Sequence, residues 1–172
     1  MIKLIMCSTL NGGIGKDNEL LYNMKEDMAF FKNITKGQTI LMGDNTWESL
    51  PKKPLPYRQN VIAGFTQAKL DKIKEEHSEI ETTTNLFSYA IQKSLDNEDV
   101  WVIGGASIYN WFIDMRLVDE AYVTLVPTVR KDADAYVKLE KLFKYLPHRD
   151  IIDEFEYEGM NVKILKLQKH RK

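Results

Sequence analysis

Short apolar runs alternate with helical patterns along most of this chain, and this alternation restricts the fold more than any other feature of the sequence. Five runs rich in β-branched residues predict strands at residues 2–6, 39–42, 60–63, 100–103 and 120–126. The segments between them predict helices at residues 25–34, 45–50, 86–95 and 107–113. Strands joined through helices run parallel, so the pattern predicts an α/β fold with a largely parallel sheet and helices on both faces.

The C-terminal part of the chain follows a different pattern. Residues 151–157 and 162–167 flank a turn, which predicts an antiparallel hairpin closing one edge of the sheet. The proline cluster at residues 51–56 is short and strands follow it, so we interpret it as a stiff loop within one domain spanning residues 1–172. We expect the charge-rich residues 69–81 to form a solvated helix or loop. Residues 169–172 are expected to be a frayed end.

The charge balance argues against a protein that binds polyanions. Lys and Arg total 24 and Asp and Glu total 25, so the basic surplus of a nucleic-acid-binding domain is missing and we expect a small substrate. The single cysteine, Cys7, cannot form an internal disulfide, and the three histidines are far apart, which favours a reducing compartment and no metal site. The apolar N-terminus is too short to span a bilayer and does not resemble a signal peptide, so we expect a cytoplasmic protein without a membrane partner, by default a monomer.

A glycine-rich segment at residues 11–17 follows the first predicted strand. Asp17 stands where a nucleotide triphosphatase needs Ser or Thr, and Asn18 stands at the third glycine of the dinucleotide fingerprint, so the segment matches neither motif. Two interpretations stay open from these residues. The segment is either a flexible surface loop or a mobile lid over a site.

Asp27 is the most informative ionisable residue. It lies at helical spacing from Met24 and Phe31, on an apolar face that also includes Met28 and Ile34. One interpretation is a first-turn acid that stabilises the start of the helix. The other is a carboxylate held in an apolar pocket to bind a cationic or amidine-like group, because an unpaired charge on such a face is costly.

Glycines follow two predicted strands directly before helices, as Gly43 and as the pair Gly104-Gly105. Such glycines let a ligand approach the backbone, and a helix N-terminus offers free N–H groups to phosphate, although a tight turn explains either motif equally well. Two such sites in one α/β sheet suggest a dinucleotide. Three residues near these glycines are, taken singly, better explained as helix-start or core residues: Thr46, Trp47 and Tyr109.

Five motifs, each weak alone, occur in the order and spacing of one family. They are Ile14-Gly15; Asn23 with Asp27 and Phe31; residues 42–49 (Met-Gly-Asp-Asn-Thr-Trp-Glu-Ser); residues 54–60 (Pro-Leu-Pro-Tyr-Arg-Gln-Asn); and residues 103–109 (Ile-Gly-Gly-Ala-Ser-Ile-Tyr). Together they resemble dihydrofolate reductase over nearly the whole chain. The resemblance implies a single-domain fold with a central, mostly parallel, eight-stranded sheet. It also implies reduction of dihydrofolate to tetrahydrofolate with NADPH, a step of one-carbon metabolism that antifolates target.

The resemblance implies roles for residues on the substrate side. Asp27 would bind the pterin and support protonation of its N5 atom, with Tyr22 and Leu20 near the reacting atoms. Thr124 would bind the pterin amino group, and Arg58 would pair with the α-carboxylate of the substrate's glutamate. Further residues would line the pocket: Ile5, Cys7, Leu20, Met28, Phe31, Leu50, Ile103 and Tyr109.

The cofactor site implied by the resemblance is formed by the glycine motifs and by the loop at residues 9–23, which would close over the nicotinamide. The peptide bond between Gly104 and Gly105 is expected to be cis. The residues expected to hold NADPH are Cys7, Ile14, Gly15, Leu20, Gly43, Asp44, Asn45, Thr46, Gly64, Phe65, Thr66, Ile103, Gly104, Gly105, Ala106, Ser107, Ile108 and Tyr109.

Two departures from the family pattern bear on function. Leu21-Tyr22 replaces the Pro-Trp pair of many members, although Tyr22 keeps an aromatic body with a polar tip. Asp44 stands where members usually have a basic residue that holds the 2′-phosphate of NADPH. A carboxylate repels that phosphate and can accept a hydrogen bond from a ribose 2′-hydroxyl, so we expect a weak preference for NADPH and tolerance of NADH.

Two other functions fit parts of the sequence. A related pterin or pyrimidine reductase, such as a riboflavin-pathway deaminoreductase domain, shares the fold, but the pairing of Asp27 with Arg58 matches a pterin that carries a glutamate tail. A non-catalytic protein on the same scaffold would explain the two departures, but it would not explain why the other motif residues are all present.

Overall fold

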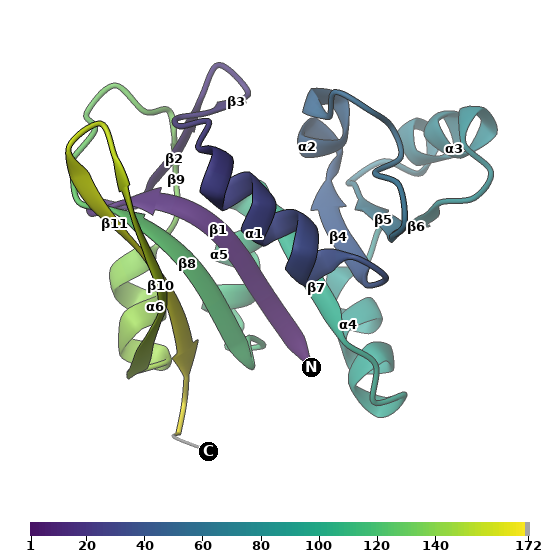
Figure 1. The fold of residues 1–172 in the computed structure, drawn as a ribbon. Coiled ribbons are helices and arrows are strands. Elements are labelled where there is room, and N and C mark those ends of the chain that lie inside the picture. The colour runs from purple at the N-terminus through teal and green to yellow at the C-terminus, as the bar shows by residue number, and fades with distance from the viewer. Residues whose placement is uncertain (171–172) are drawn as a thin grey trace.

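An eight-stranded sheet forms the centre of the molecule (Figure 1). The computed structural model describes residues 1–170, so Arg171 and Lys172, part of the expected frayed end, lie outside the described residues. The strands of this sheet are β1 (Ile2–Thr9), β4 (Thr39–Gly43), β5 (Gln59–Ala63), β6 (Glu81–Thr83), β7 (Val100–Gly104), β8 (Glu120–Val126), β10 (His148–Tyr157) and β11 (Met160–Gln168). They lie in the order β10-β11-β8-β1-β7-β4-β5-β6.

The direction of the strands confirms the predicted sheet. Neighbouring strands from β8 through β1, β7, β4 and β5 to β6 are all parallel. At the other edge, β11 pairs antiparallel with β8 and β10 pairs antiparallel with β11, which is the predicted C-terminal hairpin. The carboxyl ends of the parallel strands therefore meet along one edge of the sheet, the position at which α/β proteins bind ligands.

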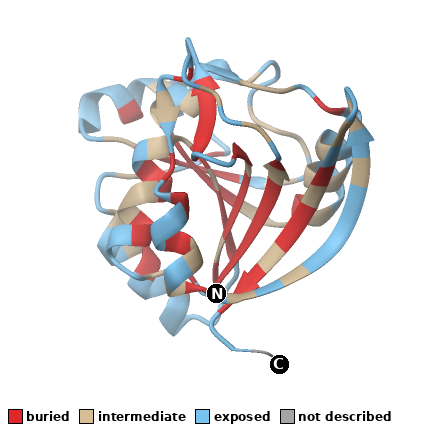
Figure 2. Ribbon diagram, turned by 90° about the vertical axis from the view of Figure 1, so that its left-hand side faces the viewer, coloured by how far each residue is buried: buried red, intermediate tan, exposed pale blue. Residues whose placement is uncertain are grey.

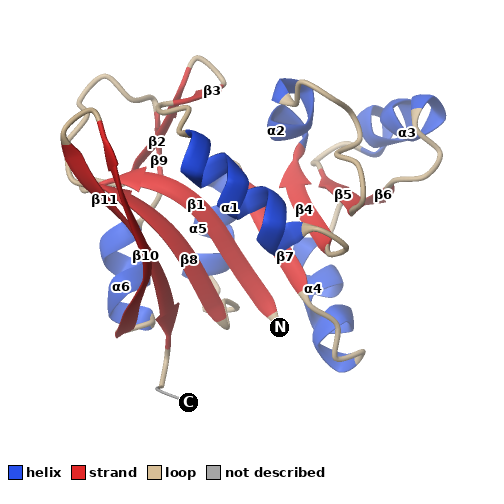
Figure 3. Ribbon diagram, viewed as in Figure 1, coloured by secondary structure: helices blue, strands red, loops and turns tan. Residues whose placement is uncertain are grey.

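Helices cover both faces of the sheet (Figure 3). One layer contains α1 (Lys25–Thr35), α2 (Asp44–Ser49) and α3 (Gln67–Glu76), and the other contains α4 (Leu86–Leu95), α5 (Ala106–Asp114) and α6 (Leu139–Tyr145). Side chains alternate along a strand, so successive strand residues pack against opposite helix layers. In β1, Leu4 and Met6 pack with the α4–α6 layer, whereas Ile5 packs with the α1–α3 layer.

Burial follows the same layout (Figure 2). The inner strands are almost entirely buried, while β10 at the edge is mostly exposed. The near-continuous apolar character of the inner strands is typical of a parallel sheet covered on both faces. Among the helices of residues 1–170, none combines the length and apolar character that a membrane crossing requires.

Several short elements were not predicted. Inside the expected loop at residues 9–23, β2 (Gly13–Lys16) and β3 (Glu19–Leu20) form a hairpin, and β9 (Ala135–Tyr136) pairs with β2. These strands are two to four residues long, too short to show a periodic pattern. The predictions also missed β6 and α6, and in the charge-rich segment at residues 69–81 the structure has most of α3.

Candidate active site

The larger of two adjoining cavities lies at the carboxyl ends of β4, β5, β6 and β7 and has a volume of about 570 Å³. The chain leaves these strands into α2, α3, α4 and α5, so the first residues of several helices line its wall. Gly105 is the N-cap residue of α5, and no side chain caps this helix start. Its free N–H groups and the helix dipole favour an anionic ligand such as phosphate.

The smaller cavity, of about 140 Å³, lies between β1, the β2–β3 hairpin and the Gly104-Gly105 turn. Asn18, Thr46, Gly105, Ala106 and Ala135 line both cavities, so the two spaces adjoin. Together they form an elongated site with a wide end at β4–β6 and a narrow end at β1.

The Gly104-Gly105 turn leaves backbone open to this site. Gly104 has φ +131°, which side-chain-bearing residues rarely adopt. A Cβ atom on Gly105 would have one neighbour within 4 Å, Oγ1 of Thr46 at 3.4 Å. The peptide bond between the two glycines is cis, as expected. Open backbone, an uncapped helix start and an elongated cavity fit a bound dinucleotide.

The structure brings nearly all of the expected cofactor residues together. Those at the narrow end are Cys7, Ile14, Gly15, Leu20, Ile103, Gly104 and Tyr109, and those at the wide end are Gly43, Asp44, Asn45, Gly64, Phe65, Ser107 and Ile108. Thr46, Gly105 and Ala106 lie in between. Thr66 lies outside both linings and is the N-cap residue of α3.

Asp27 lies in the first turn of α1 and accepts a hydrogen bond from Thr124 of β8, with 2.5 Å between Oγ1 and Oδ1. Asp27 is therefore a first-turn acid that also contacts the sheet, and its role in binding a ligand stays a prediction. Burial raises the pKa of Asp27 above its usual range, and the Thr124 hydrogen bond opposes that shift. No basic side chain is hydrogen-bonded or ion-paired with it among the described residues.

Asp27 belongs to a small cluster beside the narrow end. Cys7 and Tyr109 both line the smaller cavity, and burial, with a further contribution from the Asp27 charge, raises the pKa of each. Tyr109 donates a hydrogen bond to the carbonyl of Ile5 at 2.5 Å. Cys7 is the register partner of Thr124 across β1 and β8. The Asp27 carboxylate therefore lies near a thiol and a phenol whose raised pKa values keep both of them neutral.

The raised pKa of Asp27 predicts a stability effect. A folded state that binds the Asp27 proton more tightly than the unfolded state loses stability as pH rises from the ordinary aspartate pKa through the raised value, and the loss is complete above it. We therefore expect the ligand-free Asp27→Asn variant to have a higher Tm than the wild type at neutral pH. The difference is expected to shrink as the pH falls toward the ordinary aspartate pKa. Thermal unfolding at several pH values measures it, and a lower Tm for the variant at neutral pH would contradict the assigned burial.

The other expected substrate residues divide into two groups. Ile5, Phe31, Leu50 and Ile103 pack in one apolar cluster with the α1 side of the sheet. Met28 and Leu20 are 48% and 65% exposed, so their side chains border open space instead of the protein interior. Of these two, only Leu20 lines one of the two cavities, the smaller one.

Arg58 is held next to the end of α1. Its Nε donates to Oγ1 of Thr35 at 2.9 Å, and its terminal nitrogens donate to the carbonyls of Pro56 and Lys32 at 2.6 and 2.9 Å. The guanidinium also lies 5.9 Å from the ring centroid of Phe31. Each terminal nitrogen keeps one further N–H, which leaves a fork suited to a carboxylate.

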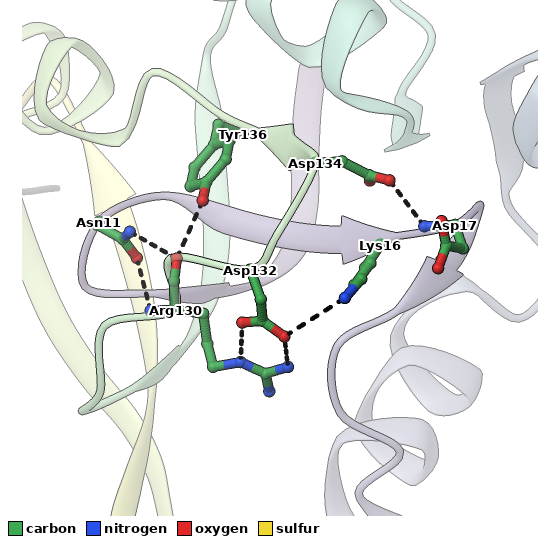
Figure 4. A network of polar contacts seen from close by, with 7 residues as sticks. All are labelled: Asn11, Lys16, Asp17, Arg130, Asp132, Asp134 and Tyr136. Atoms are coloured by element: carbon green, nitrogen blue, oxygen red, sulfur yellow. Dashed lines mark hydrogen bonds and ion pairs between the residues drawn. The ribbon is translucent and has the colours of Figure 1, made fainter.

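A polar network ties the β2–β3 hairpin to the segment between β8 and β9 (Figure 4). Arg130 forms a bidentate pair with Asp132 at 2.6 Å, and Lys16 approaches the same carboxylate at 4.0 Å. The backbone N–H of Asp17 donates to Oδ2 of Asp134 at 2.9 Å. These contacts hold the hairpin beside the narrow end of the site, and the lid interpretation of residues 11–17 stays a prediction.

Tyr22 borders this network. Its ring is 5.6 Å from the Arg130 guanidinium and makes an edge contact with Tyr157. It packs in the same cluster as Cys7. Tyr22, which was expected near the reacting atoms, is thus held by contacts with Arg130 of the polar network and with Tyr157 of the C-terminal hairpin.

Sequence patterns missed several residues of the site. Asn18 lines both cavities and donates to the carbonyl of Asn45 at 3.2 Å, and residues 83–87 line the wide end. Lys69 pairs with Asp44 at 3.1 Å. None of these lies in a glycine motif. The available signals were the expected loop at residues 9–23, which contains Asn18, and the predicted helix at residues 86–95. Within residues 1–170, no three potential metal ligands gather at one place.

Comparison with known proteins places these features in one family. The family model described as "Dihydrofolate reductase" matches residues 1–166. A dihydrofolate reductase of Ureaplasma parvum is 35% identical over 159 residues, covering 90% of this chain and 93% of that protein. Dihydrofolate reductases of Buchnera aphidicola and Haemophilus influenzae are 33% and 30% identical, over 84% and 77% of this chain and 83% and 76% of their own lengths.

Proposed function

Because the chain belongs to the dihydrofolate reductase family, we propose that it reduces dihydrofolate to tetrahydrofolate with NADPH as the reductant. One observation carries the proposal. Asp27, hydrogen-bonded to Thr124, lies beside residues that line the narrow end of a cavity fit for a dinucleotide. The product would serve one-carbon metabolism, which makes the protein a candidate antifolate target, and we expect it to act as a cytoplasmic monomer.

Asp27 and Thr124 recognise the pterin in this proposal. The Asp27 carboxylate accepts hydrogen bonds from pterin N3 and the 2-amino group, and the Thr124 hydroxyl fixes the orientation of that carboxylate. Positive charge develops on the pterin as N5 gains a proton, and the ionised carboxylate stabilises this charge in surroundings poor in water. Tyr22 and Leu20 border the place where water delivers the proton.

The cofactor, when bound, supplies the hydride that reduces pterin C6. The Gly104-Gly105 backbone and Thr46 border the middle of the elongated site, and the start of α5 offers N–H groups to the cofactor phosphates. The β2–β3 hairpin covers the narrow end through the Asp17–Asp134 contact and excludes water there.

Asp44 leads us to expect a weak preference between the two nicotinamide cofactors. It lines the wide end of the site, where the adenosine end of the cofactor would lie. Its negative charge opposes a 2′-phosphate and can accept from a 2′-hydroxyl. We predict that kcat/KM with NADPH exceeds that with NADH by less than about 100-fold. Steady-state kinetics with each cofactor measures the ratio, and a preference of many hundredfold would rule the expectation out.

The function itself is tested by incubating the purified chain with NADPH and either dihydrofolate or a ribosylated pyrimidine of the riboflavin pathway. We expect NADPH to be oxidised when dihydrofolate is the substrate but not when the pyrimidine is, because Arg58 provides a fork for a glutamate carboxylate. NADPH oxidation with the pyrimidine but not with dihydrofolate would indicate that the protein acts as a riboflavin-pathway reductase. Oxidation with neither would indicate a non-catalytic scaffold.

A further inference from the structure

A cation outside both cavities affects the charge at the wide end of the site. Lys69, in the first turn of α3, places Nζ 3.1 Å from Oδ2 of Asp44 and 3.2 Å from Oε1 of Glu48. Asp44 is the one charged side chain among the described residues that line the larger cavity. The electrostatic character of this wall therefore depends on a lysine from a different helix.

We propose that Lys69 is the specificity-determining cation of this chain: it binds the 2′-phosphate of NADPH, and Asp44 and Glu48 compete with that phosphate for it. The inference rests on the proposed function, because it takes the wide end of the site as the place of the cofactor's adenosine. It assigns the positive charge to a residue of α3 instead of to position 44, where Asp44 stands.

The side chain of Lys69 can reach a ligand. It is 43% exposed and has a flexible four-carbon stem, whereas its partner Asp44 is 24% exposed on the cavity wall. Hydrogen bonds to Asp44 and Glu48 raise the pKa of Lys69, so it stays cationic at neutral pH. A movement of the ammonium group toward the cavity would exchange a carboxylate partner for a phosphate without a change in the backbone.

The other lysine near the site is poorly placed for this role. Lys16 lines the smaller cavity, at the opposite end, and approaches Asp132 at 4.0 Å. It is the last residue of β2 and belongs to the polar network that holds the hairpin (Figure 4). At the wide end the cation next to the wall is Lys69, which is ion-paired with the wall residue Asp44.

The competition sets the expected specificity. Asp44, Glu48 and Lys69 together carry a charge of −1, so a dianionic phosphate must draw Lys69 away from two carboxylates. A ribose 2′-hydroxyl can donate to Asp44 while both ion pairs remain. Removing the lysine is therefore expected to weaken phosphate binding, and neutralising Asp44 is expected to strengthen it.

Binding of two adenosine fragments tests the assignment without turnover. Adenosine 2′,5′-bisphosphate and adenosine 5′-monophosphate are titrated by calorimetry into the wild type, Lys69→Gln, Asp44→Asn and Lys72→Gln. The last variant is a matched control, since Lys72 is an exposed lysine on the same helix. We expect Lys69→Gln to weaken bisphosphate binding about 10-fold and monophosphate binding less than about 2-fold. We expect Asp44→Asn to tighten bisphosphate binding about 5-fold, and Lys72→Gln to leave both unchanged.

The outcomes separate this inference from the proposed function. Equal weakening of both fragments in Lys69→Gln, or an effect no larger than that of Lys72→Gln, would overturn the role of Lys69 while dihydrofolate reduction could still be observed. Selective loss of the bisphosphate in a protein that does not turn over dihydrofolate would support the role of Lys69 and contradict the proposed function.

Discussion

Replacing Asp27 by asparagine is expected to lower kcat for dihydrofolate at neutral pH by at least about 100-fold, with the fold intact. Asparagine has nearly the same shape and can still accept the hydrogen bond that Thr124 donates at 2.5 Å in the wild type. What it cannot do is hold a negative charge beside the pterin as N5 gains its proton. The loss therefore measures charge stabilisation, and not a change in packing.

The pH dependence of this variant provides its control. At low pH part of the dihydrofolate is already protonated, so the carboxylate is needed less and we expect turnover of Asp27→Asn to recover in part. The wild type is expected to show no comparable gain. Turnover that is undiminished across the pH range, in a variant whose circular dichroism matches the wild type, would contradict the assignment of Asp27.

Replacing Arg58 by glutamine is expected to raise KM for dihydrofolate about 100-fold and to change kcat only a few-fold. The guanidinium keeps one free N–H on each terminal nitrogen, which can hold the substrate's α-carboxylate in a bidentate pair. Arg58→Lys keeps the charge but loses the fork, so we expect an intermediate rise of about 10-fold. Steady-state kinetics with varied dihydrofolate measures both effects.

A truncated substrate separates recognition from structure in the Arg58 variants. Arg58 also donates to the carbonyl of Lys32 and to Thr35, so its loss disturbs the end of α1. Dihydropteroate lacks the glutamate, and we expect its KM to be nearly the same in the wild type and in Arg58→Gln. A parallel rise of KM for both substrates would show that Arg58 acts only through the position of α1.

Much of the fold follows from residue patterns that neighbour each other in sequence. The apolar run along β1 is sufficient to predict a buried strand, and in the structure Leu4 and Ile5 face opposite layers. The C-terminal hairpin was predictable because apolar residues flank a turn at Glu158 and Gly159, both of which have positive φ. By contrast, β2 and β9 are held by pairing between segments more than a hundred residues apart, which no local pattern records.

The same distinction applies to the site. Glycines before helix starts pointed to both ends of the cofactor cavity, because a turn and a phosphate site need the same backbone freedom. The partners that tune the site come from elsewhere in the chain: Asp134 contacts the hairpin at Asp17, and Lys69 pairs with Asp44. Sequence identified Asp44 as an unusual charge, but only the folded chain supplies its counterion.

The rate of tetrahydrofolate formation from dihydrofolate and NADPH, compared between the wild type and Asp27→Asn at neutral pH, decides whether the chain works as proposed. We predict steady product formation by the wild type and a rate at least about 100-fold lower for the variant. Equal rates would contradict the role of Asp27, and a wild type that forms no tetrahydrofolate would contradict the function.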